Sequence, residues 1–129
     1  VPDWGGFFVL PRLVGLQKAK ELVYTAKKVG AEEAKQIGLI LDIVGQDTAM
    51  AEAREFAGRF RLASTAAIGM SKNILNQSFN LDHRTVLDLE ADAQGMALTS
   101  PYHREAVRRF TAKEPAVFDW EKLSEGRGR

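Results

Sequence analysis

The sequence predicts a mainly α-helical chain with one short β-strand, and three observations carry that prediction. Apolar residues recur at three- and four-residue spacing in several long segments, which is the pattern of amphipathic helices. Glycines and polar capping residues stand where such segments would begin or end. A single short run, Leu39 to Val44, is rich in β-branched residues and favours a strand.

Two helices are expected in the first 25 residues. Gly5 and Gly6 precede an apolar run in which Pro11 removes an amide donor, so we expect a short helix bent near that proline. After Gly15 an apolar stripe predicts an amphipathic helix that ends near Thr25. The members of the stripe are Leu16, Ala19, Leu22, Val23 and Ala26.

A third helix is expected in the segment AEEAKQI. Gly30 can serve as its N-cap, and Glu32 and Glu33 lie in the first turn, where the helix dipole favours anions. Gly38 supplies a left-handed stop. The strand from Leu39 to Val44 follows directly.

Helices are predicted from Asp47 to near the end of the chain. Asp47 or Thr48 can cap the first of them, and Ser64 or Thr65 begins the second, which runs to about Gln77. The first has an apolar face made by Ala49, Ala53, Phe56, Ala57 and Phe60.

Two more helices complete the pattern. The third in this series carries an apolar seam of Val86, Leu89, Ala93, Met96 and Ala97. The fourth starts at Ser100, has Pro101 in the favoured first helical position and is ended by Pro115. The final residues, SEGRGR, are polar and glycine-rich, and we expect them to fray.

Composition limits the class of protein. A chain of 129 residues with 45% apolar content can support one ordinary core and suggests a single domain. The net charge of +1 gives no global reason to expect nucleic acid, and the absence of cysteine excludes disulfides and thiolate metal sites. The two histidines form no ligand pattern, so no metal is expected. We expect a cytoplasmic protein with no membrane partner, since no apolar run approaches the roughly 20 residues that span a bilayer.

The chain is expected to be a piece of a larger protein that associates with other subunits. Val1 begins abruptly inside the helical pattern, which suggests a C-terminal piece. The strand at Leu39 to Val44 has no convincing partner within the chain, and the apolar area of Phe7, Phe8 and the Phe56/Phe60 face exceeds what short neighbouring elements cover. Oligomerisation would bury both.

Several motifs resemble one known family. PDWGG, LPRLVG, the block AEEAKQIGLI and the late motif FTAKEPAVF look like the C-terminal half of the crotonase superfamily, the enoyl-CoA hydratases and isomerases, from Pro2 to Phe118. The resemblance implies the C-terminal part of the α/β crotonase (ClpP/crotonase-like) spiral fold. Residues 1–44 would end its core, 45–118 would form a helical trimerisation region and 119–129 a polar tail.

The resemblance implies an enzyme that acts on acyl-CoA thioesters in fatty-acid or aromatic-acid degradation, as a trimer or a dimer of trimers. It implies no covalently bound cofactor, because coenzyme A is part of the substrate. The two backbone amides that stabilise the enolate-like anion, and the two glutamates of the hydratases, would precede Val1. The fragment alone is therefore expected to be inactive.

Asp3 is the candidate catalytic residue. The family's isomerases often place an Asp at this position, where typical hydratases have Gly, so the resemblance slightly favours an isomerase. Such a carboxylate could move a proton between two carbons of the acyl chain. The alternative is turn chemistry, in which the Asp3 side chain caps the amides of the turn and of the following helix.

The candidate coenzyme A residues are Phe110, Lys113 and Lys72. Phe110 and Lys113 match an aromatic and a basic residue with which the family commonly contacts the nucleotide end of coenzyme A, often across a subunit interface, and Lys72 resembles a family lysine. Glu114 departs from the pattern, because an Arg commonly follows the lysine. The alternatives are a core phenylalanine and solvated cations. Arg108 and Arg109 add positive charge but point in different directions.

Two functional classes follow from the sequence. The first is part of an acyl-CoA hydratase or isomerase. The second is a noncatalytic α-helical association module that binds no cofactor. An upstream ββα half in the parent gene would favour the first, and a translation start near Val1 the second.

Overall fold

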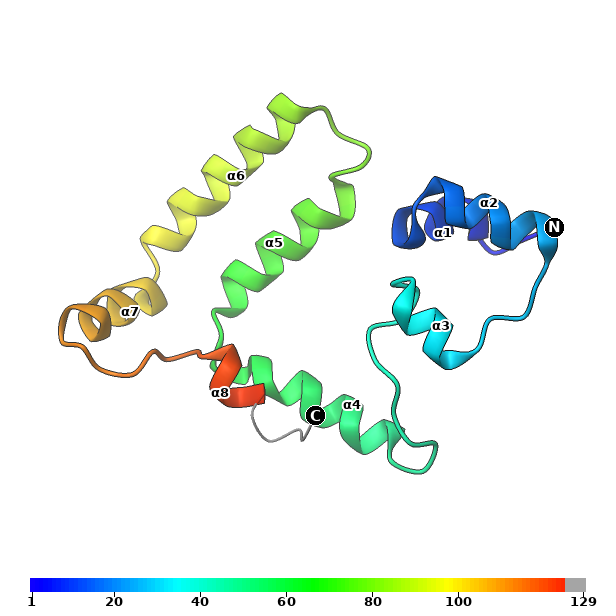
Figure 1. Ribbon diagram of the computed structural model, residues 1–129. Helices are drawn as coiled ribbons and strands as arrows, with labels where there is room; N and C mark the ends of the chain where they lie inside the picture. Colours follow the sequence, from blue (N-terminus) through cyan, green and yellow to red (C-terminus); the bar gives the residue numbers. More distant parts are fainter. Residues whose placement is uncertain (125–129) are drawn as a thin grey trace. The chain divides into compact units, whose positions relative to one another are not determined.

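The computed structural model describes residues 1–124, and these residues are mainly helical (Figure 1). The helices fall close to the segments expected from apolar spacing and capping residues. Their bounds are α1 Gly6–Val14, α2 Leu16–Thr25, α3 Ala31–Gln36, α4 Ala49–Gly58, the 3₁₀ turn η1 Arg59–Leu62, α5 Thr65–Gln77, α6 His83–Leu98, α7 Pro101–Thr111 and α8 Trp120–Ser124.

The chain divides into two compact units, Val1–Glu52 and Ala53–Arg129, and each is described by itself. In the first unit α1 packs against α2, and Gly15 separates the two helices with a φ of 79° that glycine adopts readily. Pro11 lies inside α1, as expected. Ala19 of α2 and Ala34 of α3 are buried.

The predicted strand at Leu39 to Val44 is wrong: the described residues 1–124 contain no β-strand. The amides of Leu39 and Ile40 donate to the carbonyl of Ala34 at 2.8 and 3.3 Å. The segment therefore folds back on the end of α3, where Gly38 has the expected left-handed φ of 76°. A β-rich run needs a second strand to pair with, and this one bonds a helix end instead.

Local signals set the ends of the longer helices in the second unit. Ser64, Asp82 and Ser100 are the N-caps of α5, α6 and α7, and their side chains accept hydrogen bonds from the amides of Ala67, Thr85 and His103. α5 and α6 form a helical hairpin and pack side by side, and α7 follows with Pro101 at its first turn (Figure 1).

An aromatic cluster joins α4 and η1 to the segment that ends in α8. The Phe56 and Phe60 rings lie 5.7 Å apart, and the Trp120 ring lies 5.6 Å from Phe56 and 5.3 Å from Phe60. Phe118 stacks on Phe60 at 6.4 Å. The Phe56/Phe60 face thus has partners that the sequence analysis missed. α8 begins at Trp120, inside the segment expected to be a polar tail; the frayed end expected for SEGRGR lies largely outside the described residues.

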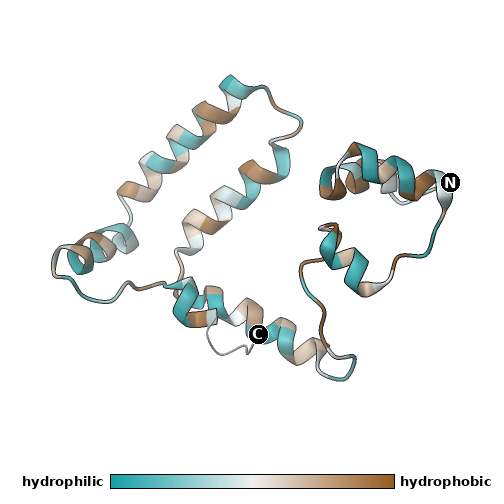
Figure 2. Cartoon of the chain, in the orientation of Figure 1, coloured by the Kyte–Doolittle hydropathy of each residue, from teal (hydrophilic) through white to brown (hydrophobic). Residues whose placement is uncertain are grey.

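Few side chains of the described residues are buried. The buried ones are Ala19, Ala34, Ala63 and Arg59. Hydrophobic and hydrophilic residues both occur along the longer helices (Figure 2), with apolar residues at the three- and four-residue spacing of amphipathic helices. Much of the apolar surface nevertheless faces solvent, including Phe7, Tyr24, Leu75, Phe79 and Phe110.

Candidate functional site

The turn that holds Asp3 is closed by backbone bonds. The amide of Gly6 donates to the carbonyl of Asp3 at 2.9 Å, and the amides of Phe8 and Val9 donate to the carbonyl of Gly5 at 2.9 and 3.0 Å. Gly5 is the N-cap of α1, with a φ of 83° that favours glycine. The glycine pair therefore has the structural role of turning the chain into α1.

The Asp3 carboxylate takes no part in that turn. Asp3 is exposed, and within residues 1–124 its side chain accepts no hydrogen bond from the amides of the turn or of α1. No contact among the described residues therefore supports a capping role for the Asp3 side chain. Trp4 is also exposed, in a left-handed conformation with a φ of 53°.

Phe110 and Lys113 lie together at the C-terminal end of α7. Phe110 is 87% exposed and is therefore not a core residue. Its backbone carbonyl accepts the amide of Lys113 at 3.2 Å, and Lys113 follows the last turn in a left-handed conformation with a φ of 55°. No hydrogen bond or ion pair joins the Lys113 side chain to the described residues. An exposed ring and an unneutralised ammonium group thus share one helix end.

A groove of about 390 Å³ runs beside Phe110. α7 forms one wall, and the segment that follows α7 forms the other. The lining residues are Tyr102, His103, Ala106, Val107, Phe110, Glu114, Ala116, Val117 and Phe118. Aromatic and aliphatic walls with few polar groups suit a planar ring such as a nucleobase.

The two arginines of α7 are bound by glutamates of their own segment. Arg108 donates to both oxygens of Glu105, at 2.8 and 2.9 Å, and to both oxygens of Glu114, at 2.9 and 2.7 Å. Arg109 donates to Glu105 at 2.7 Å and to the carbonyl of Pro115 at 3.2 Å. Hydrogen bonds from Arg108 and Arg109 lower the pKa of Glu105 to about 2, and the bond from Arg108 lowers that of Glu114.

The sequence analysis singled out Arg108, Arg109 and Glu114 but missed Glu105 and the ion pairs that join these residues. Glu105 lies three and four residues before the arginines, a spacing that predicts helical ion pairs. The bond from Arg108 to Glu114 could not be foreseen, because it depends on the left-handed turn at Lys113.

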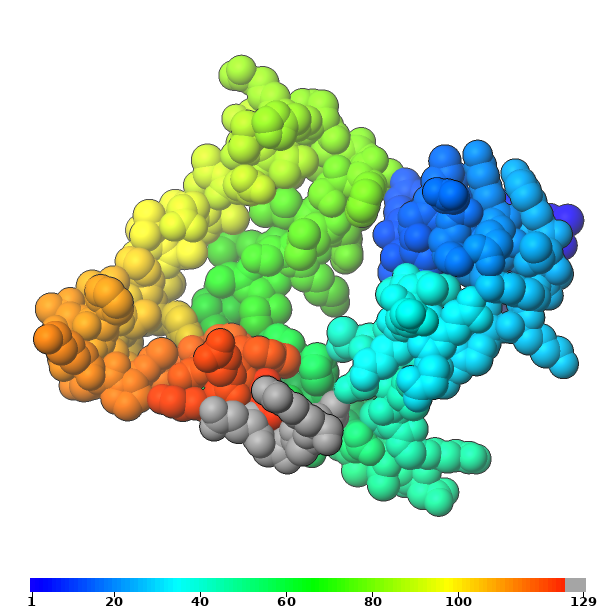
Figure 3. Space-filling model, viewed as in Figure 1, coloured from blue at the N-terminus to red at the C-terminus, as the bar shows by residue number. Residues whose placement is uncertain are grey.

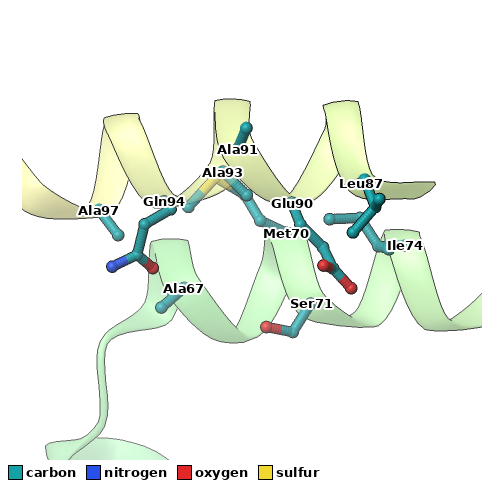
Figure 4. Close-up of a pocket in the computed structure, with 10 residues that line it drawn as sticks. All are labelled: Ala67, Met70, Ser71, Ile74, Leu87, Glu90, Ala91, Ala93, Gln94 and Ala97. Atoms are coloured by element: carbon teal, nitrogen blue, oxygen red, sulfur yellow. The ribbon is translucent and has the colours of Figure 1, made fainter. Parts of the chain in front are cut away.

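Lys72 lies elsewhere in the second unit. It is exposed on α5 and does not line the groove beside Phe110. A larger hollow of about 550 Å³ lies between α5 and α6 and is lined by residues of both helices (Figures 3 and 4). Met70, Ile74 and Leu87 give it an apolar wall, and Ser71 and Glu90 are among its polar groups. Lys72 follows Ser71 and is not among the lining residues.

Asp3 belongs to the first unit, whereas Phe110, Lys113 and Lys72 belong to the second. The part of the chain that the structure describes holds no group of three or more side chains suited to a metal ion. Among the described helices, none has the length and apolar character that crossing a membrane requires.

The comparisons identify the family. The enoyl-CoA hydratase/isomerase family model matches residues 1–122, and the chain belongs to that family. The chain is 35% identical to a crotonyl-CoA hydratase of Syntrophomonas wolfei, with 91% of this chain and 45% of the relative covered. It is 33% identical to a 1,2-epoxyphenylacetyl-CoA isomerase of Escherichia coli, with 92% and 45% covered.

Solved structures of the same family are similar to this chain. An enoyl-CoA hydratase/isomerase from Cupriavidus metallidurans is 36% identical and superposes with a TM-score of 0.81, over 92% of this chain and 44% of that one. The fold is thus part of a crotonase fold. The chain spans somewhat less than half the length of the relatives it matches. These matches do not support the assignment to the C-terminal half, which stays a prediction.

Proposed function

We propose that this chain is part of an enzyme that acts on acyl-CoA thioesters, and that the end of α7 binds the nucleotide end of coenzyme A. The observation that carries the proposal is the exposed Phe110 ring beside a groove, with the Lys113 ammonium group three residues further on. The ring can stack on adenine, and the ammonium group can pair with a phosphate. Family membership makes an acyl-CoA the expected substrate.

Asp3 is proposed as the proton-transfer residue of the parent enzyme, which favours an isomerase over a hydratase. Its carboxylate is exposed and accepts no capping bond within residues 1–124, so it is available to a bound acyl chain. A carboxylate that takes a proton from one carbon and returns it to another needs no other group for that step. One relative is named as an isomerase and another as a hydratase, so the names favour neither reaction.

The remaining chemistry is assigned to residues outside this chain. In the proposed assignment the chain is the C-terminal part of the crotonase fold, and the amides that stabilise the enolate-like anion come from another part. The isolated chain should therefore be inactive. Lys72 is proposed to contact coenzyme A from a second copy of the chain, since it lies apart from the groove beside Phe110.

Titration of the chain with coenzyme A tests the binding site. Binding should be weak and should weaken further with salt, because one exposed lysine supplies the charge. Dephospho-coenzyme A lacks the phosphate on the adenosine ribose and is the matched control. Equal affinity for both compounds, or tight binding that does not change with salt concentration, would contradict a site for the nucleotide end of coenzyme A.

The second candidate is a noncatalytic association module. The exposed apolar side chains favour it, because helices with uncovered faces need partners. The two candidates share the expectation of a trimer or a multiple of it, which light scattering in dilute solution can test. They differ in ligand binding, because a trimer that does not bind coenzyme A would favour the association module. A monomer with a cooperative melt would contradict the predicted assembly.

A further inference from the structure

The end of α7 has an unusual residue at a position that normally requires glycine. The amide of Glu114 donates to the carbonyl of Arg109 at 2.9 Å, and the amide of Lys113 donates to that of Phe110 at 3.2 Å. Helices that close in this way commonly place glycine in the left-handed position. Here that position is Lys113, with a φ of 55°, and its Cβ makes the conformation unfavourable. A side-chain contact across this turn would offset part of that cost.

Arg108 makes such a contact. It donates to the carboxylate of Glu105, which precedes the left-handed residue, and to that of Glu114, which follows it. Both oxygens of each carboxylate lie within 2.9 Å of a guanidinium nitrogen. The planar guanidinium group can bind each of two carboxylates through both of its oxygens, whereas an ammonium group, such as that of Lys27 between Glu21 and Glu33, meets each carboxylate through one oxygen. The chain between α7 and Glu114 is thereby closed around Lys113.

The same contacts change the role of Glu114. As an isolated negative charge beside Lys113 it would weaken an anion site. Its two oxygens are instead directed at Arg108, which donates at 2.9 and 2.7 Å. The charge of Glu114 is balanced within the network, and the Lys113 side chain remains without an ion pair among the described residues.

We propose that Arg108 and Glu114 are positioning residues, which hold Lys113 in its left-handed conformation and so set the direction in which its side chain leaves the helix end that carries the Phe110 ring. This inference rests on the proposed binding of the nucleotide end of coenzyme A at α7. Arg108 is assigned no ligand contact, because its Nε, Nη1 and Nη2 atoms each donate to one or both of the two glutamates.

Two substitutions with different effects on charge separate positioning from simple electrostatics. Arg108→Lys keeps the positive charge but loses the fork that bridges two carboxylates, and Glu114→Gln removes a negative charge. Positioning predicts that both variants bind coenzyme A more weakly, by about fivefold or more in Kd. Electrostatics alone predicts no change for the first variant and tighter binding for the second. Tighter binding by Glu114→Gln would overturn the proposal.

A double-substitution cycle tests whether the effect passes through Lys113. In a Lys113→Ala background, Arg108→Lys should cause little further loss of affinity, because no ammonium group remains to be placed. Arg104→Lys is the matched control: it lies on the same helix and bonds the carbonyl of Thr99 rather than the glutamates. Its Kd should stay unchanged. Equal losses from Arg108→Lys with and without Lys113 would refute positioning.

A measurement without ligand separates this inference from the proposed function. The three-bond coupling between the amide and α protons of Lys113 reports its φ in solution. Arg108→Lys and Glu114→Gln should both change this coupling, whereas Arg104→Lys should not. Unchanged coupling in Arg108→Lys and Glu114→Gln would overturn the positioning role of Arg108 and Glu114, whether or not the chain binds coenzyme A. Changed coupling in a chain that binds no coenzyme A would overturn the proposed function, and the ligand role of this network with it.

Discussion

The turn at Asp3 and the end of α7 both contain a non-glycine residue in a left-handed conformation, but they are held in different ways. Trp4 has a φ of 53° and Lys113 a φ of 55°. The first turn is closed by backbone bonds and by glycine at position 5, and its Asp3 carboxylate makes no capping bond within residues 1–124. The second is closed by backbone bonds and by two carboxylates on Arg108.

The difference separates two uses of a charged side chain. The Asp3 carboxylate makes no hydrogen bond in the turn that carries it, so replacing this side chain should affect the chemistry and leave the fold unchanged. Glu105, Glu114 and Arg108 stabilise the helix end that carries Lys113, so changing them should affect local structure first.

The largest effect is expected at Asp3. In the full-length parent enzyme, Asp3→Asn should lower turnover by roughly 10²-fold or more, because an amide cannot act as a base near neutral pH. Thermal stability should hardly change, since no hydrogen bond of the turn uses the carboxylate. Steady-state kinetics and a thermal melt measure the two quantities.

Asp82→Asn is the matched control for that experiment. Asp82 is a capping carboxylate of α6, which accepts from the amide of Thr85 at 3.1 Å and from its hydroxyl at 2.6 Å. Replacing it should affect stability and spare turnover. Near-normal turnover by the Asp3→Asn enzyme would eliminate the catalytic role of Asp3.

A smaller effect is expected from removing the left-handed side chain at α7. Lys113→Gly should stabilise the chain by about 1 kcal/mol, because glycine adopts a positive φ without a steric cost. The same variant should lose affinity for coenzyme A, since the ammonium group is gone. Chemical denaturation and ligand titration measure the two changes.

Ala26→Gly is the control for Lys113→Gly. Ala26 ends α2 with a φ of 50°, so glycine there should bring a similar gain in stability. It is not a candidate ligand residue, and affinity should stay the same. If Lys113→Gly lost stability while Ala26→Gly gained it, the Lys113 side chain would contribute to the fold, and the contrast between the two helix ends would fail.

Local sequence signals predicted the helices because helix ends depend on neighbouring residues. Ser64, Gly38, Ser100 and Pro101 each act within one turn of their own position, and the structure confirms all four. The strand at Leu39 to Val44 failed for the opposite reason. Its composition favoured a strand, but a strand exists only with a partner, and that partner is absent from residues 1–124.

Contacts between distant residues set the second limit. The Phe56 and Phe60 face was expected to lack partners in the chain, because Phe118 and Trp120 follow about sixty residues later and no spacing connects them. Prediction of the candidate site at the end of α7 has the same limit, because it too depends on contacts that sequence spacing does not reveal. The residue types at Phe110 and Lys113 could be read from the motif, whereas the bond from Arg108 to Glu114 required the turn between them.

The smallest effect is expected in the acid titration of the two regions. Hydrogen bonds from Arg108 and Arg109 lower the pKa of Glu105 from 4.5 to about 2 in the folded chain. A carboxyl whose pKa is lowered on folding stabilises the fold above its ordinary pKa, and this contribution is lost as the pH falls through the folded value. The α7 end should therefore keep its ion pairs at pH 4 and lose them near pH 2. The carboxyl carbon shift of Glu105, followed by NMR, should titrate near 2, and in Arg108→Lys it should titrate closer to 4.5, while the amide signal of Gly6 in the Asp3 turn should be the same in both proteins. A wild-type Glu105 that titrates at its ordinary value would show that the ion pairs do not persist in solution, and Lys113 would then need another reason for its left-handed conformation.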